Sequence, residues 1–116
     1  MDTSGGTTMV MLFKPKHVDL IQRRIKVQTR RVWKHCRVKV GNVYQARTKL
    51  FDKGSTFARL KVLAIGREML LDVSESDARE EGYEDRAAFL QAFHEINGDE
   101  SNPNPLVWVI KFEVVG

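Results

Sequence analysis

Apolar residues recur along the chain with two periods, one typical of strands and the other typical of helices. Two-residue alternation or short apolar runs predict strands over residues 9–13, 43–51, 56–66, 69–73 and 106–115. In the last of these segments every second residue from Leu106 to Val114 is apolar, so these side chains would share one face of a sheet. Glycine and polar residues between neighbouring segments favour tight turns.

Three other segments have signals typical of helices, either the helical spacing of apolar residues or characteristic end residues. The first covers residues 16–25. The second follows Ser74, which stands three residues before Asp77 in a capping-box arrangement, and is expected to end at Gly82. The third covers residues 84–96. The sequence therefore predicts three short helices among the strands.

These elements predict the class and the domain organisation of the fold. Strands and helices do not alternate regularly, which excludes a doubly wound sheet. Adjacent short strands with inserted helices favour an α+β fold, a small β-barrel or half-barrel of five to six strands flanked by about three short helices. A chain of 116 residues can bury one core, so we expect a flexible leader over residues 1–8 and a single domain over residues 9–116. Met1, Met9 and Met11 are all candidate start residues.

Composition and cysteine content are those of an ordinary globular protein. Hydrophobic residues make up 42% of the chain and charged residues 29%. Cys36 is the one cysteine, so no intramolecular disulfide can form, which fits a reducing cytoplasm. No apolar run approaches the length of a membrane span. We therefore expect a cytoplasmic protein that does not enter a membrane, and we assume a monomer.

Charge is divided unevenly between the two halves of the chain. Residues 1–61 contain 15 of the 19 lysines and arginines and three acidic residues, a net charge of +12. Residues 62–116 contain four basic and twelve acidic residues, a net charge of −8. Such asymmetry favours a surface that faces a polyanion such as RNA. Neutralisation of the two halves against each other across the fold explains it equally well.

The common catalytic and cofactor motifs are absent from the sequence. It contains no phosphate-binding loop, no dinucleotide glycine pattern, no Gly-x-Ser-x-Gly and no paired cysteines. His17, His35, Cys36 and His94 are scattered, so we predict neither a metal site nor a cofactor. Aromatic residues, Trp33 among them, interleave with cations, a pattern that suits stacking of single-stranded RNA or free bases. Aromatic residues at such positions also commonly build a core.

Residues 24–33, RIKVQTRRVW, carry the most distinctive chemical pattern, and locally they predict a turn or an irregular sheet edge. Together with VGN, FARLKVLAIG, LLDVSESDAREEGY, FLQAFHEI and VWVIKFEVV, this segment resembles the ASCH (ASC-1 homology) family of the PUA-like superfamily over nearly the whole chain after the leader. Lys26, Thr29 and Arg31 match the family pattern Gly-x-Lys-x-x-Thr-x-Arg. Arg24 occupies the glycine position, which suggests that the turn before Lys26 is built differently or needs no positive φ.

The resemblance implies a PUA-like barrel with a cleft between the Lys-x-x-Thr-x-Arg segment and the acidic helix. The family is widely proposed to bind RNA. One small bacterial branch of similar length hydrolyses N4-acetylcytidine with a lysine, a threonine three residues later and a glutamate on the later helix. These residues correspond here to Lys26, Thr29 and Glu81, with Glu80 the alternative if the alignment shifts by one. The residues expected to contact RNA or a modified nucleoside are Arg24, Arg30, Arg31, Trp33, Lys34 and Arg37.

The same residues allow three functional interpretations and one structural interpretation. The first interpretation is a module that binds RNA or a modified nucleoside, which needs exposed, well-spread cations. The alternative is an amidohydrolase acting on N4-acetylcytidine or a related acylated base, which needs an enclosed Lys26 with a depressed pKa that can activate Thr29. A protein-interaction role for the acidic region over residues 74–100 is the third interpretation. The structural alternative is that Lys26 and Glu81 form a stabilising ion pair while Thr29 bonds to the backbone.

Overall fold

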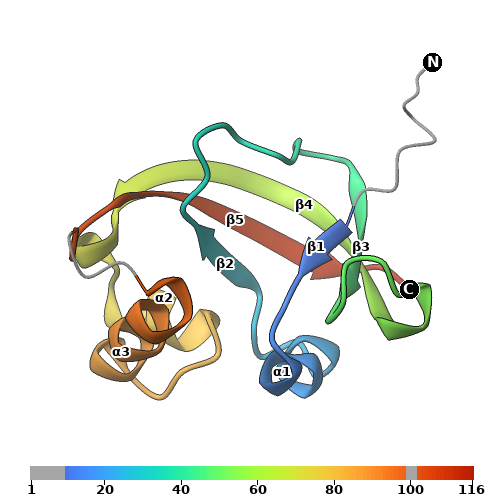
Figure 1. The fold of residues 1–116 in the computed structure, drawn as a ribbon, viewed down its shortest axis with the longest axis horizontal. Coiled ribbons are helices and arrows are strands. Elements are labelled where there is room, and N and C mark those ends of the chain that lie inside the picture. The colour runs from blue at the N-terminus through green and yellow to red at the C-terminus, as the bar shows by residue number, and fades with distance from the viewer. Residues whose placement is uncertain (1–9, 99–101) are drawn as a thin grey trace.

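The computed structural model describes residues 10–98 and 102–116, and its central feature is a five-stranded mixed sheet (Figure 1). The strands are β1 (Val10–Leu12), β2 (Gln28–Arg31), β3 (Val43–Arg47), β4 (Thr56–Met69) and β5 (Leu106–Val114). Their order is β1-β3-β4-β5-β2, in which β1 pairs with β3 in parallel and every other pair is antiparallel. The predicted leader over residues 1–8, which includes Met1, lies outside the described residues, and so does Met9.

Three α-helices accompany the sheet, as the sequence predicted. They are α1 (Val18–Gln22), α2 (Glu75–Glu80) and α3 (Arg86–Asn97), with the short 3-10 helices η1 (Pro15–His17), η2 (Lys53–Ser55) and η3 (Leu70–Asp72). The expected cap is present, since Oγ of Ser74 accepts a hydrogen bond from the Asp77 amide at 2.9 Å at the start of α2. The strand expected over residues 69–73 is wrong, because β4 ends at Met69 and the chain continues into η3. No helix among the described residues is long and apolar enough to cross a membrane.

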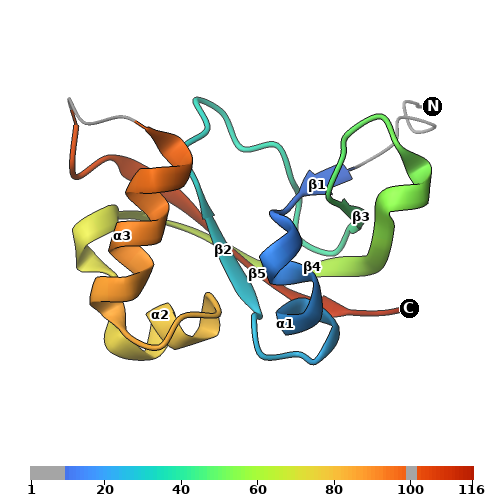
Figure 2. The same ribbon diagram turned by 60° about the horizontal axis from the view of Figure 1, so that its bottom comes forward.

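Strand β5 separates two apolar clusters. Ile110 and Phe112 belong to the larger cluster, which also takes residues from β1, β3 and β4, whereas Val107 and Val109 pack with residues of α2 and α3. The sequence pattern identified only the first of these two faces. Figure 2 shows α2 and α3 together on one side of β2 and α1 on the other. Side chains of β2 can therefore meet residues from both parts of the fold.

The sheet is open and does not close into the predicted barrel, whereas the α+β class is confirmed. Its two edges are β1 and β2. The side chain of Arg31 on β2 spans the gap between them, because its Nη2 donates a hydrogen bond to the Leu12 carbonyl on β1 at 2.7 Å. A side-chain bridge keeps the two strands further apart than a backbone ladder would. Both residues line the cavity that opens between the edges.

The basic segment folds as the regular edge strand β2, where the sequence predicted a turn or an irregular edge. The side chains of Gln28, Thr29 and Arg30 are buried. Burial of Gln28 and Arg30 is tolerated because carboxylates from the acidic half of the chain accept their hydrogen bonds. A polar sequence thus forms a buried strand because its partners arrive from distant positions.

Arg24 adopts a positive φ of 62°, a conformation that glycine takes more readily than any other residue. The turn between α1 and β2 therefore does use the left-handed region, and the suggestion that it needs no positive φ is wrong. In this turn the Arg24 amide donates a hydrogen bond to the Ile21 carbonyl at 3.0 Å. Arg24 thus has a conformation that glycine would adopt without strain.

We expect Arg24→Gly to raise the free energy of unfolding by about 0.5–1 kcal/mol, because relief of left-handed strain exceeds the extra freedom of glycine in the unfolded chain. Arg24 is exposed, and its side chain bonds to the nearby Gln22 carbonyl, so the substitution removes little else. Denaturant titration measures the change. Arg23→Gly is the matched control, because Arg23 has a φ of −85° and should lose stability on the same substitution. Equal losses in both variants would show that Arg24 is not strained.

Candidate functional site

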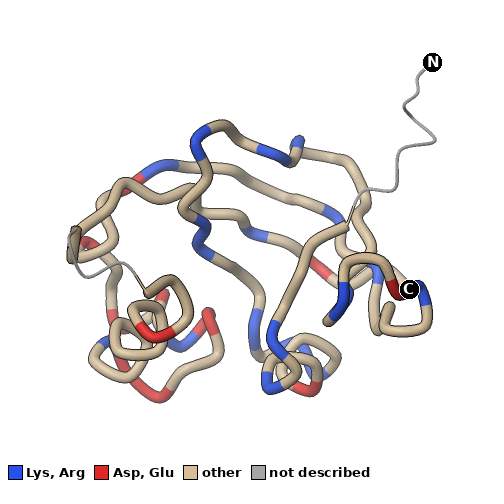
Figure 3. Tube along the Cα trace, in the orientation of Figure 1, with Lys and Arg blue, Asp and Glu red and all other residues tan. Residues whose placement is uncertain are grey.

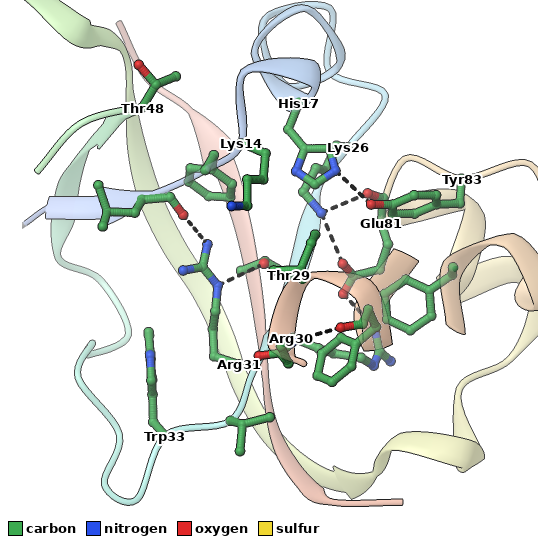
Figure 4. Close-up of a pocket in the computed structure, with 17 residues that line it drawn as sticks. Lys14, His17, Lys26, Thr29, Arg30, Arg31, Trp33, Thr48, Glu81 and Tyr83 are labelled. Atoms are coloured by element: carbon green, nitrogen blue, oxygen red, sulfur yellow. Dashed lines mark hydrogen bonds and ion pairs between the residues drawn. The ribbon is translucent and has the colours of Figure 1, made fainter. Parts of the chain in front are cut away.

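A cavity of about 370 Å³ opens between strands β1 and β2 and the unit formed by α2 and α3 (Figure 4). A volume of this size suits a small molecule such as a nucleoside. Of the nine residues that the sequence singled out, six line this cavity: Lys26, Thr29, Arg30, Arg31, Trp33 and Glu81. The fold thus brings together two segments that are some fifty residues apart in the chain.

A buried ion pair between Lys26 and Glu81 forms one wall of the cavity. The two side chains are 2% and 3% exposed, and Nζ of Lys26 lies 3.0 Å from Oε1 of Glu81. Nζ donates a second hydrogen bond to the Glu81 carbonyl at 2.7 Å. Burial lowers the pKa of Lys26 and outweighs the opposing effect of Glu81, while Arg31 and Arg30 add to the lowering. The lysine is enclosed and its pKa is depressed, which is what the enzymatic interpretation needs.

Local backbone geometry places this pair. Glu81 stands directly after the last turn of α2, and Gly82 follows with a φ of 102°. A Cβ atom on Gly82 would lie 3.0 Å from Cδ1 of Leu20 and 3.5 Å from Cβ of Lys26. Glycine is favoured here by its positive φ, and a larger residue would also displace the end of the Leu20 side chain.

Arg30 lies buried behind the ion pair and contacts three carboxylates. Its Nη1 donates to Oε2 of Glu81 at 2.9 Å, and its Nη2 lies 2.6 Å from Oε1 of Glu68 and 3.2 Å from Oδ2 of Asp77. The sequence placed Arg30 among the contacts to RNA, but its guanidinium is occupied inside the protein, where the basic and acidic halves neutralise each other. Within residues 10–98 and 102–116, no group of His, Cys, Asp and Glu side chains could hold a metal ion.

The structural alternative expected Thr29 to bond to the backbone, but the structure pairs its hydroxyl with the side chain of Arg31. Nε of Arg31 donates a hydrogen bond to Oγ1 of Thr29 at 3.1 Å, and the Arg31 guanidinium lies 4.9 Å from the centre of the Phe13 ring. Figure 4 shows Thr29 between Arg31 and Lys26. Guanidinium nitrogens only donate, so the Thr29 oxygen accepts from Arg31 and can give its own proton to another group.

His17 and Tyr83 complete the wall beside Lys26, and sequence reasoning missed both. Nε2 of His17 lies 2.9 Å from the Tyr83 hydroxyl oxygen. Burial, followed by the charge of Lys26 and two other cations, lowers the pKa of His17 to about 3, so its imidazole is neutral at neutral pH. No local signal joins two residues that are 66 positions apart.

The other predicted contact residues divide between the cavity mouth and the outer surface. Trp33 stands at the mouth, where the guanidinium groups of Arg31 and Arg37 lie 5.9 and 5.6 Å from its ring, within cation–π range. Lys34 is exposed on the segment that follows, and Arg24 lines a separate hollow of about 250 Å³. Figure 3 shows basic residues along β2 and the following segment, and acidic residues gathered on and around α2 and α3.

An open mixed sheet with three helices and a buried Lys–Glu pair facing a small cavity defines this α+β protein. No protein-family model matches the sequence, and the search of curated proteins found no match. Among solved structures, an ASCH domain from Lactobacillus crispatus is similar with a TM-score of 0.72 at 18% identity, covering 92% of this chain and 79% of that one. A protein from Enterococcus faecalis assigned to family DUF984 has a TM-score of 0.70 at 18% identity, covering 92% and 76%. The chain thus has the fold of an ASCH domain, as its sequence resemblance implied.

Proposed function

We propose that this protein hydrolyses acylated nucleosides, with N4-acetylcytidine as the representative substrate, and that Lys26, Thr29 and Glu81 carry out the reaction. The observation that carries the proposal is the enclosed lysine, which is 2% exposed and paired with Glu81 at a cavity of nucleoside size. A lysine that only binds RNA phosphates is expected at the surface, where the polyanion can reach it. The correspondence of Lys26, Thr29 and Glu81 to the catalytic residues of the hydrolysing branch favours the same reaction.

Lys26 acts as the base in its neutral form, which burial favours. The two N–H groups of the neutral amine donate to the Glu81 side chain and carbonyl, which leaves the nitrogen lone pair to accept the proton of Thr29. Arg31 donates to Oγ1 of Thr29 and stabilises the negative charge that develops on this oxygen. The Thr29 oxygen then attacks the carbonyl carbon of the amide and forms a tetrahedral intermediate.

The intermediate collapses when the bond between the acyl carbon and the exocyclic nitrogen breaks. The proton held by Lys26 passes to the leaving amine, and the acyl group stays on Thr29 as an ester. A water molecule then gives a proton to Lys26 and attacks the ester carbon. Acetic acid leaves and loses its proton to the solvent, and Lys26 returns its own proton to the Thr29 oxygen. Glu81 remains ionised throughout and holds the lysine in place.

Replacement of Thr29 by valine tests this function directly. Valine keeps the shape of threonine and removes the nucleophile, so we expect release of acetate from N4-acetylcytidine to fall by about 10³-fold or more. Thr29→Ser keeps a hydroxyl and should retain measurable turnover. Chromatographic detection of cytidine and acetate measures both. Equal rates in the wild type and Thr29→Val would remove Thr29 from the mechanism, and absence of turnover in the wild type would refute hydrolysis of this substrate.

Binding of single-stranded RNA is a second candidate function, favoured by the position of Trp33 at the cavity, within cation–π distance of the guanidinium groups of Arg31 and Arg37. Bases stack on such an aromatic ring while exposed cations, here Lys34 and Arg37, contact phosphates. If the wild type does not hydrolyse the nucleoside, this function requires that RNA binding weakens steeply with salt and in Arg37→Ala. Undetectable or salt-independent binding would exclude it too.

A further inference from the structure

Arg30 has no part in the reaction as written, yet it contacts one of the reacting residues. The side chain is buried, with Nη1 donating to Oε2 of Glu81 at 2.9 Å. Nζ of Lys26 donates a hydrogen bond to Oε1 of the same carboxylate at 3.0 Å. Two buried cations therefore share one buried anion, each through a different oxygen.

We propose that Arg30 is a positioning residue of this site: it holds Oε2 of Glu81 so that Oε1 faces Lys26, and by sharing the carboxylate charge it lets Lys26 release its proton. The inference rests on the proposed hydrolase function, because a lysine needs to lose its proton only if it acts as a base. It assigns Arg30 a role inside the site in place of the contact to RNA that the sequence suggested.

The charge on Glu81 has to be shared because an unshared carboxylate would keep Lys26 protonated. A full ion pair in a buried site raises the pKa of a lysine, against the effect of burial. Arg30 bonds to the same carboxylate, which weakens the attraction of Glu81 for Lys26, and the positive charge of Arg30 repels the ammonium form of Lys26. Burial opposes the charge on Arg30, but its bonds to Glu68 and Glu81 prevail and raise its pKa, so Arg30 stays ionised while Lys26 titrates.

Glu68 and Asp77 hold Arg30 in this position from two other elements. Glu68 on β4 and Asp77 on α2 both contact Nη2, and Nη1 also donates to the side-chain oxygen of Gln28. The Arg30 guanidinium further lies 5.9 Å from the centre of the Phe89 ring. Contacts from a strand, a helix and an aromatic ring hold the Arg30 guanidinium in place, and this guanidinium in turn holds the Glu81 carboxylate.

The remaining charged or titratable groups around Lys26 leave this role to Arg30. They are Lys14 before η1, His17 on η1, Arg31 on β2, Tyr83 after α2, and Arg24 with Glu113 at the adjacent hollow. His17 is neutral at neutral pH, and burial raises the pKa of Tyr83 to about 12, so neither changes charge there. Arg24 and Glu113 carry opposite charges. Arg31 also repels Lys26, but it bonds to Thr29 and Leu12 and not to Glu81.

An NMR titration of protein labelled with ¹³C at lysine Cε tests the inference without turnover, with Lys26→Met used to assign the resonance. We expect Arg30→Met to move the midpoint of the Lys26 titration upward by about one pH unit or more. Glu68→Gln should move the midpoint downward, because the substitution removes a negative charge and Arg30 then interacts more strongly with Glu81. Arg47→Met is the matched control: Arg47 is another buried arginine, but its bonds go to Thr56, Leu50 and Gln45, so the midpoint should not move.

Opposite shifts in Arg30→Met and Glu68→Gln, with none in Arg47→Met, would establish the role of Arg30. An unchanged midpoint in both variants, or an equal shift in Arg47→Met, would overturn it. If Arg30→Met does not fold, Glu68→Gln decides, since Glu68 is 23% exposed and its substitution is mild. A wild type that fails to hydrolyse N4-acetylcytidine refutes the proposed function separately, while the titration still decides whether Arg30 controls the proton on Lys26.

Discussion

Lys26→Met is expected to reduce hydrolysis of N4-acetylcytidine by about 10³-fold or more, because it removes the base that activates Thr29. Methionine has nearly the length of lysine and fills the same buried space. Glu81 keeps a cation partner in Arg30, so the variant should remain folded. Steady-state rates measured beside Lys34→Met, which replaces an exposed lysine, would separate loss of the base from a general loss of positive charge.

Lys26→Arg sharpens this test because arginine keeps the charge and cannot act as a base at neutral pH. If Lys26 serves only to bind a phosphate, the arginine variant should retain function. If Lys26 is the base, the arginine variant should be as inactive as Lys26→Met. Turnover near the wild-type rate in either variant would exclude Lys26 from the chemical step and favour the RNA-binding interpretation.

The parts of the fold that the sequence predicted are those specified by local signals. Strand β5 follows from the alternation between residues 106 and 115, and α2 follows from the cap at Ser74 and the glycine at position 82. In each case the period and the boundary residues lie within one short segment. Such elements can be found without any knowledge of the rest of the fold.

Strand β2 could not be predicted in the same way, because its stability depends on distant partners. Arg30 is paired with Glu68 and Glu81, which are 38 and 51 positions away. Without these carboxylates a buried arginine would cost several kcal/mol, so polarity alone predicts exposure. Closure of the sheet was misjudged for a related reason, since the side chain of Arg31 and not a backbone ladder joins β2 to β1.

Some residues of the candidate site were identified by resemblance to the family, and others could not be identified from the sequence. Lys26, Thr29 and Glu81 were named from the family resemblance, and periodicity alone would have left them as polar surface residues. His17 and Tyr83 carry no motif, and only the fold brings their side chains together at the cavity. A short motif can therefore indicate the reacting groups, but the groups that shape their surroundings come from tertiary structure.

Glu81→Leu is expected to lower the free energy of unfolding by about 3–5 kcal/mol near neutral pH, because it leaves the Lys26 ammonium buried without its anion. Arg30 loses one of three carboxylates and keeps Glu68 and Asp77, so most of the cost comes from Lys26. Denaturant unfolding of the variant and the wild type measures the difference. The double variant Lys26→Met with Glu81→Leu should recover most of the loss, because it leaves no unpaired charge at the pair.

The loss in Glu81→Leu should also depend on pH in a defined direction. Burial already lowers the pKa of Lys26 in the folded protein, and removal of Glu81 takes away the group that opposes this effect, so the folded pKa falls further. In the unfolded chain the lysine keeps a pKa of about 10.4 and binds more protons than the folded protein over the whole interval between the two values. Stability therefore rises with pH across that interval, and the deficit of Glu81→Leu should be smaller at about pH 9.5 than at about pH 6. The double variant has no lysine at this position, so its own stability should lack this rise with pH. An equal deficit for the single and double variants at both pH values would mean that the buried charge of Lys26 does not determine the stability of this site.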